Sequence, residues 1–109
     1  MRIGTVVING IRYDVTKRKM SLKDNPEKNA VPWGICDFDQ TLITLNDAAS
    51  HERRFISFIH ECFHVILYDS VSQQHIKNGK LEDLIEGIEA PLASFIRDNI
   101  KLIRKMGRF

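Results

Sequence analysis

The segment His60-Glu61-Cys62-Phe63-His64 constrains this chain more than any other feature, because it is an HExxH pattern inside a mostly apolar run. Four residues advance an α-helix by about 400°, which leaves the two histidines only about 40° apart on one face. Two imidazole nitrogens on one helical face can bind one zinc ion at about 2.0–2.1 Å. The pattern therefore predicts a helix that carries His60 and His64 as zinc ligands.

Glu61 neighbours the face of the two histidines without belonging to it. From there a carboxylate can take a proton from a water molecule, which is the general-base role of the glutamate in HExxH sites. The flanking residues are apolar from Phe55 to Tyr68, so we expect this helix to be buried on nearly every face. Three ionisable side chains there are costly unless they are paired or bind a metal. The alternative is that hydrogen bonds satisfy both histidines and that Glu61 forms an ion pair.

A catalytic zinc usually has three protein ligands and one open position. The last third of the chain offers Glu82, Glu86 and Glu89, whose spacing places them on one helical stripe. We expect Glu86 to be the third ligand, with Glu89 and then Glu82 as alternatives; a solvated acidic face is the other interpretation. A fourth protein ligand, for example His75, would close the site and make it structural.

The N-terminal half predicts strands. Residues 3–8 and 11–15 are rich in strand-forming side chains and are separated by Asn9-Gly10, the strongest short signal for a hairpin. Residues 16–32 are polar and contain two prolines, so we expect a loop there.

A second hairpin and the start of the motif helix follow this loop. Residues 33–38 and 41–45 predict two strands that turn at Asp39-Gln40. Ser50 is then a suitable N-cap for the motif helix, with the negative charge of Glu52 in its first turn.

The last helix begins at about Lys80, and its apolar residues recur at helical spacing. Pro91 interrupts it, so we expect a kink or a break near Gly87–Ala90. Strands followed by helices indicate the α+β class. We therefore expect a small, mostly antiparallel sheet packed on the buried HExxH helix, and a C-terminal helix that closes the metal site, as in a minimal zincin.

Size and composition exclude several classes of protein. The chain has 109 residues, which fits a single domain spanning residues 1–109. Its net charge of +2 is too small to indicate direct nucleic-acid binding, and its longest apolar run is too short to cross a membrane. The first residues lack the apolar stretch of a signal peptide. Cys36 and Cys62 form no CxxC pair, so we expect reduced thiols and a cytoplasmic protein.

Three segments together follow a family pattern. They are Gly34-Ile35-Cys36-Asp37-Phe38-Asp39, Phe58-Ile59-His60-Glu61-Cys62-Phe63-His64, and Ile85-Glu86-Gly87-Ile88 with the later Asp98-Asn99. This pattern resembles the ImmA/IrrE-like metallopeptidases, particularly the short versions from phages and mobile elements, over roughly residues 3–99. Alignment on Asp98-Asn99 places the family glutamate at Glu86. Phe58 stands where the family usually has a small threonine, and Pro91 lies in a helix that the family keeps continuous.

The resemblance implies a zinc metallopeptidase, a hydrolase with a gluzincin-like His/His/Glu site. Longer members look like proteases that cut helix-turn-helix repressors, so a phage or host repressor is one candidate protein substrate, in the cytoplasm of a bacterial or phage-infected cell. In proteins of this kind an edge strand commonly receives the substrate as an added strand. The alternative is a non-catalytic, zinc-binding phage protein that acts as a protein-interaction module. The sequence leaves the oligomeric state and the oxyanion stabiliser open.

Overall fold

The computed structural model describes residues 1–68 and 81–108, apart from the side chains of residues 28, 81–86 and 89. In this part of the chain four strands precede two helices, and two short 3-10 turns separate the second strand from the third. The elements are β1 (Arg2–Ile8), β2 (Ile11–Arg18), η1 (Leu22–Asp24), η2 (Pro26–Lys28), β3 (Gly34–Asp37), β4 (Leu42–Asn46), α1 (His51–Tyr68) and α3 (Leu81–Gly107). The predicted α+β class is confirmed.

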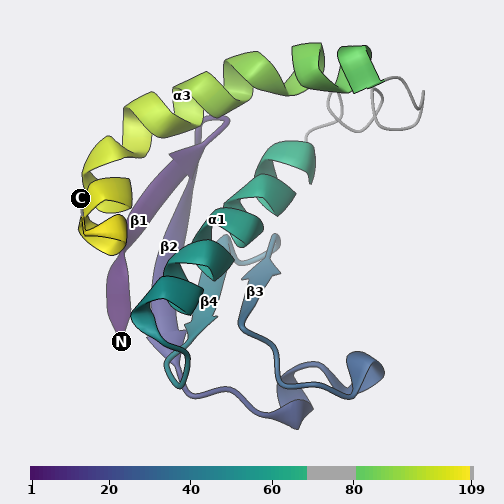
Figure 1. The fold of residues 1–109 in the computed structure, drawn as a ribbon, viewed down its shortest axis with the longest axis vertical. Helices are drawn as coiled ribbons and strands as arrows, with labels where there is room; N and C mark the ends of the chain where they lie inside the picture. Colours follow the sequence, from purple (N-terminus) through teal and green to yellow (C-terminus); the bar gives the residue numbers. More distant parts are fainter. Residues whose placement is uncertain (69–80, 109) are drawn as a thin grey trace.

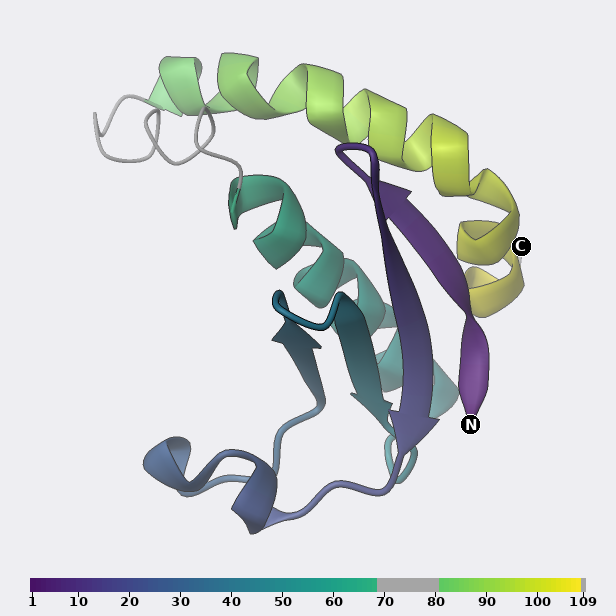
Figure 2. The same ribbon diagram turned by 180° about the vertical axis from the view of Figure 1, so that it is seen from behind.

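The strands form one sheet in the order β1-β2-β4-β3. β1 pairs with β2 and β3 with β4 in antiparallel fashion, whereas the central strands β2 and β4 run parallel. α1 lies across one face of the sheet, and α3 curves along the β1 side (Figure 1). Seen from behind, the opposite face carries no helix of the described chain (Figure 2). The expected small, mostly antiparallel sheet with two helices is therefore present.

Both predicted hairpins are present. Asn9 and Gly10 have positive φ angles of 53° and 78°, as a tight hairpin turn requires, and β1 and β2 pair on either side of them. In the second hairpin the Asp37 carboxylate accepts hydrogen bonds from the backbone amides of Asp39 and Gln40 at 3.0 and 3.1 Å. This local turn ends β3 at the edge of the sheet, where the strand packs against α1.

The hydrophobic core lies between the sheet and α1, with α3 completing it over β1. Inward-facing residues alternate along the strands, as a half-buried sheet requires. The apolar side chains with almost no exposed surface are Val6, Ile8, Val15, Ile43 and Leu45 on the strands and Phe58, Cys62 and Ile66 on α1. This core fixes the rotation of α1 about its own axis and thereby decides which of its residues face outward.

α1 begins as predicted, since the Ser50 hydroxyl accepts a hydrogen bond from the Arg53 amide at 3.2 Å. Its burial differs from the expectation. The residues at steps of four along one stripe, Ile56, His60, His64 and Tyr68, are exposed. The expectation that α1 is buried on nearly every face was therefore wrong. Even Ile56 and Tyr68, which have apolar or aromatic side chains, face solvent on this stripe.

α3 stays helical through Pro91, so the kink or break expected near Gly87–Ala90 was wrong. Proline has a helical φ angle and costs one backbone hydrogen bond, which the packed helix tolerates. The non-helical residue is Asn99, with φ −126° and ψ 16°. Its carboxamide bonds to backbone groups of Val7 and Phe95 and so competes with the helical pattern. No helix in the described ranges is both long and apolar enough to cross a membrane.

Candidate metal centre

The two motif histidines converge as their spacing predicts. The Nε2 atoms of His60 and His64 are 3.0 Å apart, and the two rings meet edge to face at an angle of 75°. Both side chains are exposed. The pair therefore presents two nitrogen donors at the surface, in a position that a ligand from solvent can reach.

This geometry fits a metal ion. Two nitrogens bound to one tetrahedral zinc at about 2.0–2.1 Å lie roughly 3.3 Å apart, close to the distance between these Nε2 atoms. The donor atoms of His60, Glu61 and His64 all lie within 4.8 Å of one another. Without a metal, the same spacing suits a hydrogen bond in which one neutral ring donates to the other. Two histidine nitrogens beside a carboxylate are donors that zinc prefers.

Glu61 has the opposite environment from the histidines, since only 7% of its surface is exposed. It lies between α1 and the edge strand β3, where Gly34 makes room for it. A methyl group on Gly34 would come within 3.3 Å of the Glu61 Cγ atom. The glycine therefore lets the carboxylate pass close to the strand. Sequence reasoning noted Gly34 only as part of the family pattern, and its contact with Glu61 was missed.

Two cysteines, Cys36 and Cys62, lie near the candidate centre. Cys62 is fully buried in the core, and burial raises the pKa of its thiol far above the ordinary value. Burial, together with the nearby charges of Glu61 and Asp37, raises the pKa of Cys36 to about 11. Both thiols therefore stay protonated at neutral pH in the metal-free protein.

A cleft runs along β3 past the candidate centre. One end, of about 430 Å³, lies beside His60, and the other, of about 330 Å³, lies beside His64. Asn25, Gly34 and Glu61 line both hollows, so the two adjoin each other along β3. An extended chain in this cleft would pass directly beside the two histidines.

The open edge of β3 presents backbone groups to this cleft. The Trp33 carbonyl accepts a hydrogen bond from the Asn46 amide at 2.9 Å, so the backbone groups of Trp33 face β4. The backbone N–H and C=O groups of successive residues in a strand point to opposite sides. Those of Gly34 and Cys36 therefore face away from β4, toward the open edge. In the described chain no strand lies beyond β3. These groups can pair with an added strand.

The candidates for the third ligand fall on side chains outside the described part of the chain. The side chains of Glu82, Glu86 and Glu89 lie outside the described residues, as does His75. The backbone of α3 is described, and the helix begins at Leu81, one residue after the predicted start. Glu86 therefore stays a prediction, and so does closure of the site by the C-terminal helix.

Comparison of the whole chain with known proteins adds nothing to this picture. No family model, curated protein or solved structure matches it. The resemblance to the ImmA/IrrE-like metallopeptidases therefore rests on the residue patterns alone.

Proposed function

We propose that this chain is a zinc-dependent peptidase that hydrolyses a peptide bond in a protein substrate. His60 and His64 would hold the metal with Glu86 as third ligand, and Glu61 would act as general base. The observation that carries the proposal is the pairing of two exposed, converging imidazoles with a buried carboxylate beside them. A peptidase needs this combination of an accessible metal and a shielded base.

The chain's own residues suit the steps of hydrolysis. Bound zinc would supply Lewis-acid chemistry, which polarises a carbonyl and makes water more acidic. Glu61 would accept a proton from the attacking water and later deliver it to the leaving amine. Its position between α1 and β3 removes most of its surface from solvent, and this holds the carboxylate at the wall of the cleft.

The open edge of β3 supports a role in substrate binding. A substrate in extended conformation would add to the sheet by pairing with the outward backbone groups of Gly34 and Cys36. Backbone pairing is largely independent of sequence, so side-chain specificity would come from the cleft. The repressor substrate and the cytoplasm of a bacterial or phage-infected cell follow from the family resemblance only, and we propose them on that basis.

A non-catalytic, zinc-binding interaction module is the second candidate. It would use the same two histidines, and the exposed apolar side chains of Val31, Trp33 and Ile56 beside them favour contact with a protein. In that case Glu61 would have no role in proton transfer. The two candidates therefore differ in what a substitution of this one residue does.

The deciding experiment compares zinc-loaded wild type with Glu61→Gln on a repressor substrate and on unfolded casein. Glutamine keeps the shape of glutamate and removes the base, so we expect hydrolysis to fall at least about 100-fold while zinc stays bound. Glu52→Gln, an exposed position in the first turn of the same helix, is the matched control. Equal cleavage by wild type and Glu61→Gln, with zinc bound in both, would refute the mechanism.

A further inference from the structure

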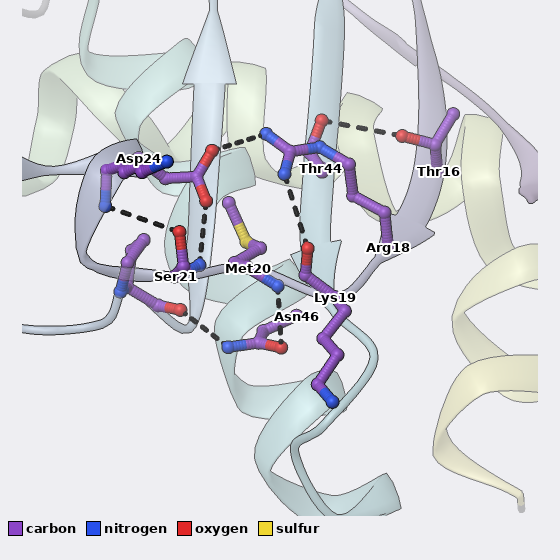
Figure 3. Close-up of polar contacts among 10 residues, drawn as sticks. Thr16, Arg18, Lys19, Met20, Ser21, Asp24, Thr44 and Asn46 are labelled. Carbon is purple, nitrogen blue, oxygen red and sulfur yellow. Dashed lines mark hydrogen bonds and ion pairs between the residues drawn. The ribbon is translucent and has the colours of Figure 1, made fainter.

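Residues 19–33, between β2 and β3, form one wall of the cleft, and two side chains tie this segment to the sheet. The first is Asp24, whose carboxylate accepts hydrogen bonds from the Arg18 guanidinium at 2.7 Å and from the Ser21 amide at 2.8 Å (Figure 3). The pKa of Asp24 is lowered, chiefly by the hydrogen bond from Arg18. The start of the segment is therefore tied to the end of β2.

The second tie is Asn46, at the end of β4, which is 1% exposed. Its Nδ2 donates to the Pro32 carbonyl at 3.0 Å, and its Oδ1 accepts from the amides of Met20 and Ala48 at 3.4 and 3.0 Å. Figure 3 shows this carboxamide beside Met20. One buried side chain thus joins both ends of the segment to the sheet, which holds the wall of the cleft in place.

The hollow behind this wall is lined by large apolar side chains together with polar ones, among them Asn25 and Ser57. Val31 and Trp33 line it from the segment and Ile56 lines it from α1, while His60 and Glu61 are also part of its lining. Val31, Trp33 and Ile56 are 43%, 50% and 47% exposed, so large apolar surfaces gather around one concavity of about 430 Å³. That volume lies in the usual range of ligand pockets.

The rim of the hollow carries a positive charge. The Arg53 guanidinium lies 5.8 Å from the centre of the Trp33 ring, within the range of a cation–π contact. The contact restrains the indole, and the charge disfavours entry of a basic side chain. An apolar side chain gives up no favourable contacts with water when it enters, and it covers the exposed surfaces of Val31, Trp33 and Ile56.

We propose that this hollow is a subsite for one large aliphatic or aromatic side chain of the substrate, next to the bond that is cleaved. The inference rests on the proposed peptidase function, because it takes the occupant to be a peptide paired with β3. Trp33 directly precedes β3, so a strand that pairs with the backbone of Gly34 and Cys36 passes the mouth of the hollow. Cleavage is therefore expected beside leucine or phenylalanine and not beside lysine.

Trp33 is the only tryptophan of the chain, so its fluorescence reports directly on the hollow. The probes are blocked hexaalanine peptides in which one central residue is leucine, phenylalanine, lysine or the original alanine. They are titrated into zinc-loaded Glu61→Gln protein, which prevents turnover. We expect the leucine and phenylalanine peptides to change the fluorescence at concentrations at least about tenfold lower than the alanine and lysine peptides.

Ile56→Ser tests the site, with Ile96→Ser as the matched control. The two isoleucines are 47% and 45% exposed, so neither substitution removes a core side chain, and Ile96 lies on α3. Ile56→Ser should weaken binding of the leucine peptide roughly tenfold, and Ile96→Ser should leave it unchanged. Equal binding of the leucine and alanine peptides, or an Ile56→Ser variant that binds like wild type, would overturn the subsite.

Hydrolysis of the same peptides by wild type separates the two proposals. Selective binding of the leucine peptide without hydrolysis that depends on Glu61 would retain the subsite as a binding site and overturn the peptidase. Hydrolysis that depends on Glu61, at equal rates for the leucine and alanine peptides, would retain the peptidase and overturn the subsite.

Discussion

At one edge of the sheet, α3 packs along β1, and a side chain of α3 completes the hydrogen bonds of one residue of the strand, Val7. The Asn99 carboxamide accepts from the Val7 amide at 2.7 Å and donates to the Val7 carbonyl at 2.7 Å, as a neighbouring strand would. Asn99 is 5% exposed, so this pairing is shielded from water. The β1 edge is therefore closed to an added strand at Val7.

At the other edge, β3 ends the described sheet, and its outward backbone groups face the cleft beside the candidate metal centre. Edge strands are sites where other chains add, and small proteins usually cover or shorten them. Here β3 has only four residues, which limits unwanted pairing and leaves room for one short segment. The comparison separates stabilising contacts at the β1 edge from the proposed chemistry at the β3 edge, so substitutions at the two edges should have separable effects.

The largest expected effect is the loss of zinc from the β3 edge. His60→Ala or His64→Ala should weaken zinc affinity at least about 1,000-fold, roughly 4 kcal/mol, because each removes one ligand. Both side chains are exposed, so the metal-free protein should unfold as wild type does. Titration against a competing chelator measures the affinity, and wild type should bind one zinc per chain.

The same titration ranks the predicted third ligand. Glu86→Ala should weaken binding more than Glu82→Ala or Glu89→Ala, and His51→Ala should have no effect, because His51 begins α1 beside a different hollow. A wild-type protein that binds no zinc would refute the centre. A larger effect at Glu89 than at Glu86 would show that the family alignment was wrong.

The next effect concerns stability at the β1 edge. Asn99→Ala would remove the partners of the partly buried amide and carbonyl of Val7, and we expect a loss of about 2–4 kcal/mol in the free energy of unfolding. Urea denaturation of the metal-free protein measures this loss. Asp98→Ala is the matched control, because its ion pair with Arg97 is exposed to solvent. If Asn99→Ala weakened zinc affinity as strongly as His60→Ala, the two edges would not be separable.

The features that sequence reasoning recovered are local ones. A hairpin is encoded by its turn, as Asn9 and Gly10 show, and the convergence of His60 and His64 follows from helical geometry alone. The features that it missed join distant segments. Asn99 bonds to Val7 across 92 positions, and no local pattern indicates such a pairing.

Loop packing was missed for the same reason. The sequence of residues 16–32 predicts a polar loop. The hydrogen bonds that hold this segment in place as a wall of the cleft come from Asn46, which lies in a later strand. The parallel pairing of β2 with β4 also depends on this long connection, whereas the antiparallel pairs are specified by their turns. The burial of α1 was overestimated because its composition does not tell which residues the sheet covers.

The smallest expected effect compares one glycine at each edge. Gly34→Ala would place a methyl group 3.3 Å from the Glu61 Cγ and 3.3 Å from the Leu45 Cδ2. The flexible side chain of Glu61 can move away from the added methyl group, whereas Leu45 is fully buried in the core and has no room to move. Alanine also loses less chain entropy than glycine on folding, which offsets part of the crowding. The free energy of unfolding should therefore change by less than about 1 kcal/mol.

Hydrolysis should respond more than stability does, because a base displaced by a few tenths of an ångström no longer meets the water correctly. We expect kcat to fall roughly tenfold, with zinc affinity unchanged. Gly4→Ala is the control at the opposite edge, where the added methyl group would lie 3.1 Å from the Leu102 Cδ1 on α3. It crowds β1 against α3, far from Glu61 in the fold, so it should lower stability and leave kcat unchanged. A Gly34→Ala variant with the kcat of wild type, or a Gly4→Ala variant that loses as much, would break the assignment of chemistry to one edge and stability to the other.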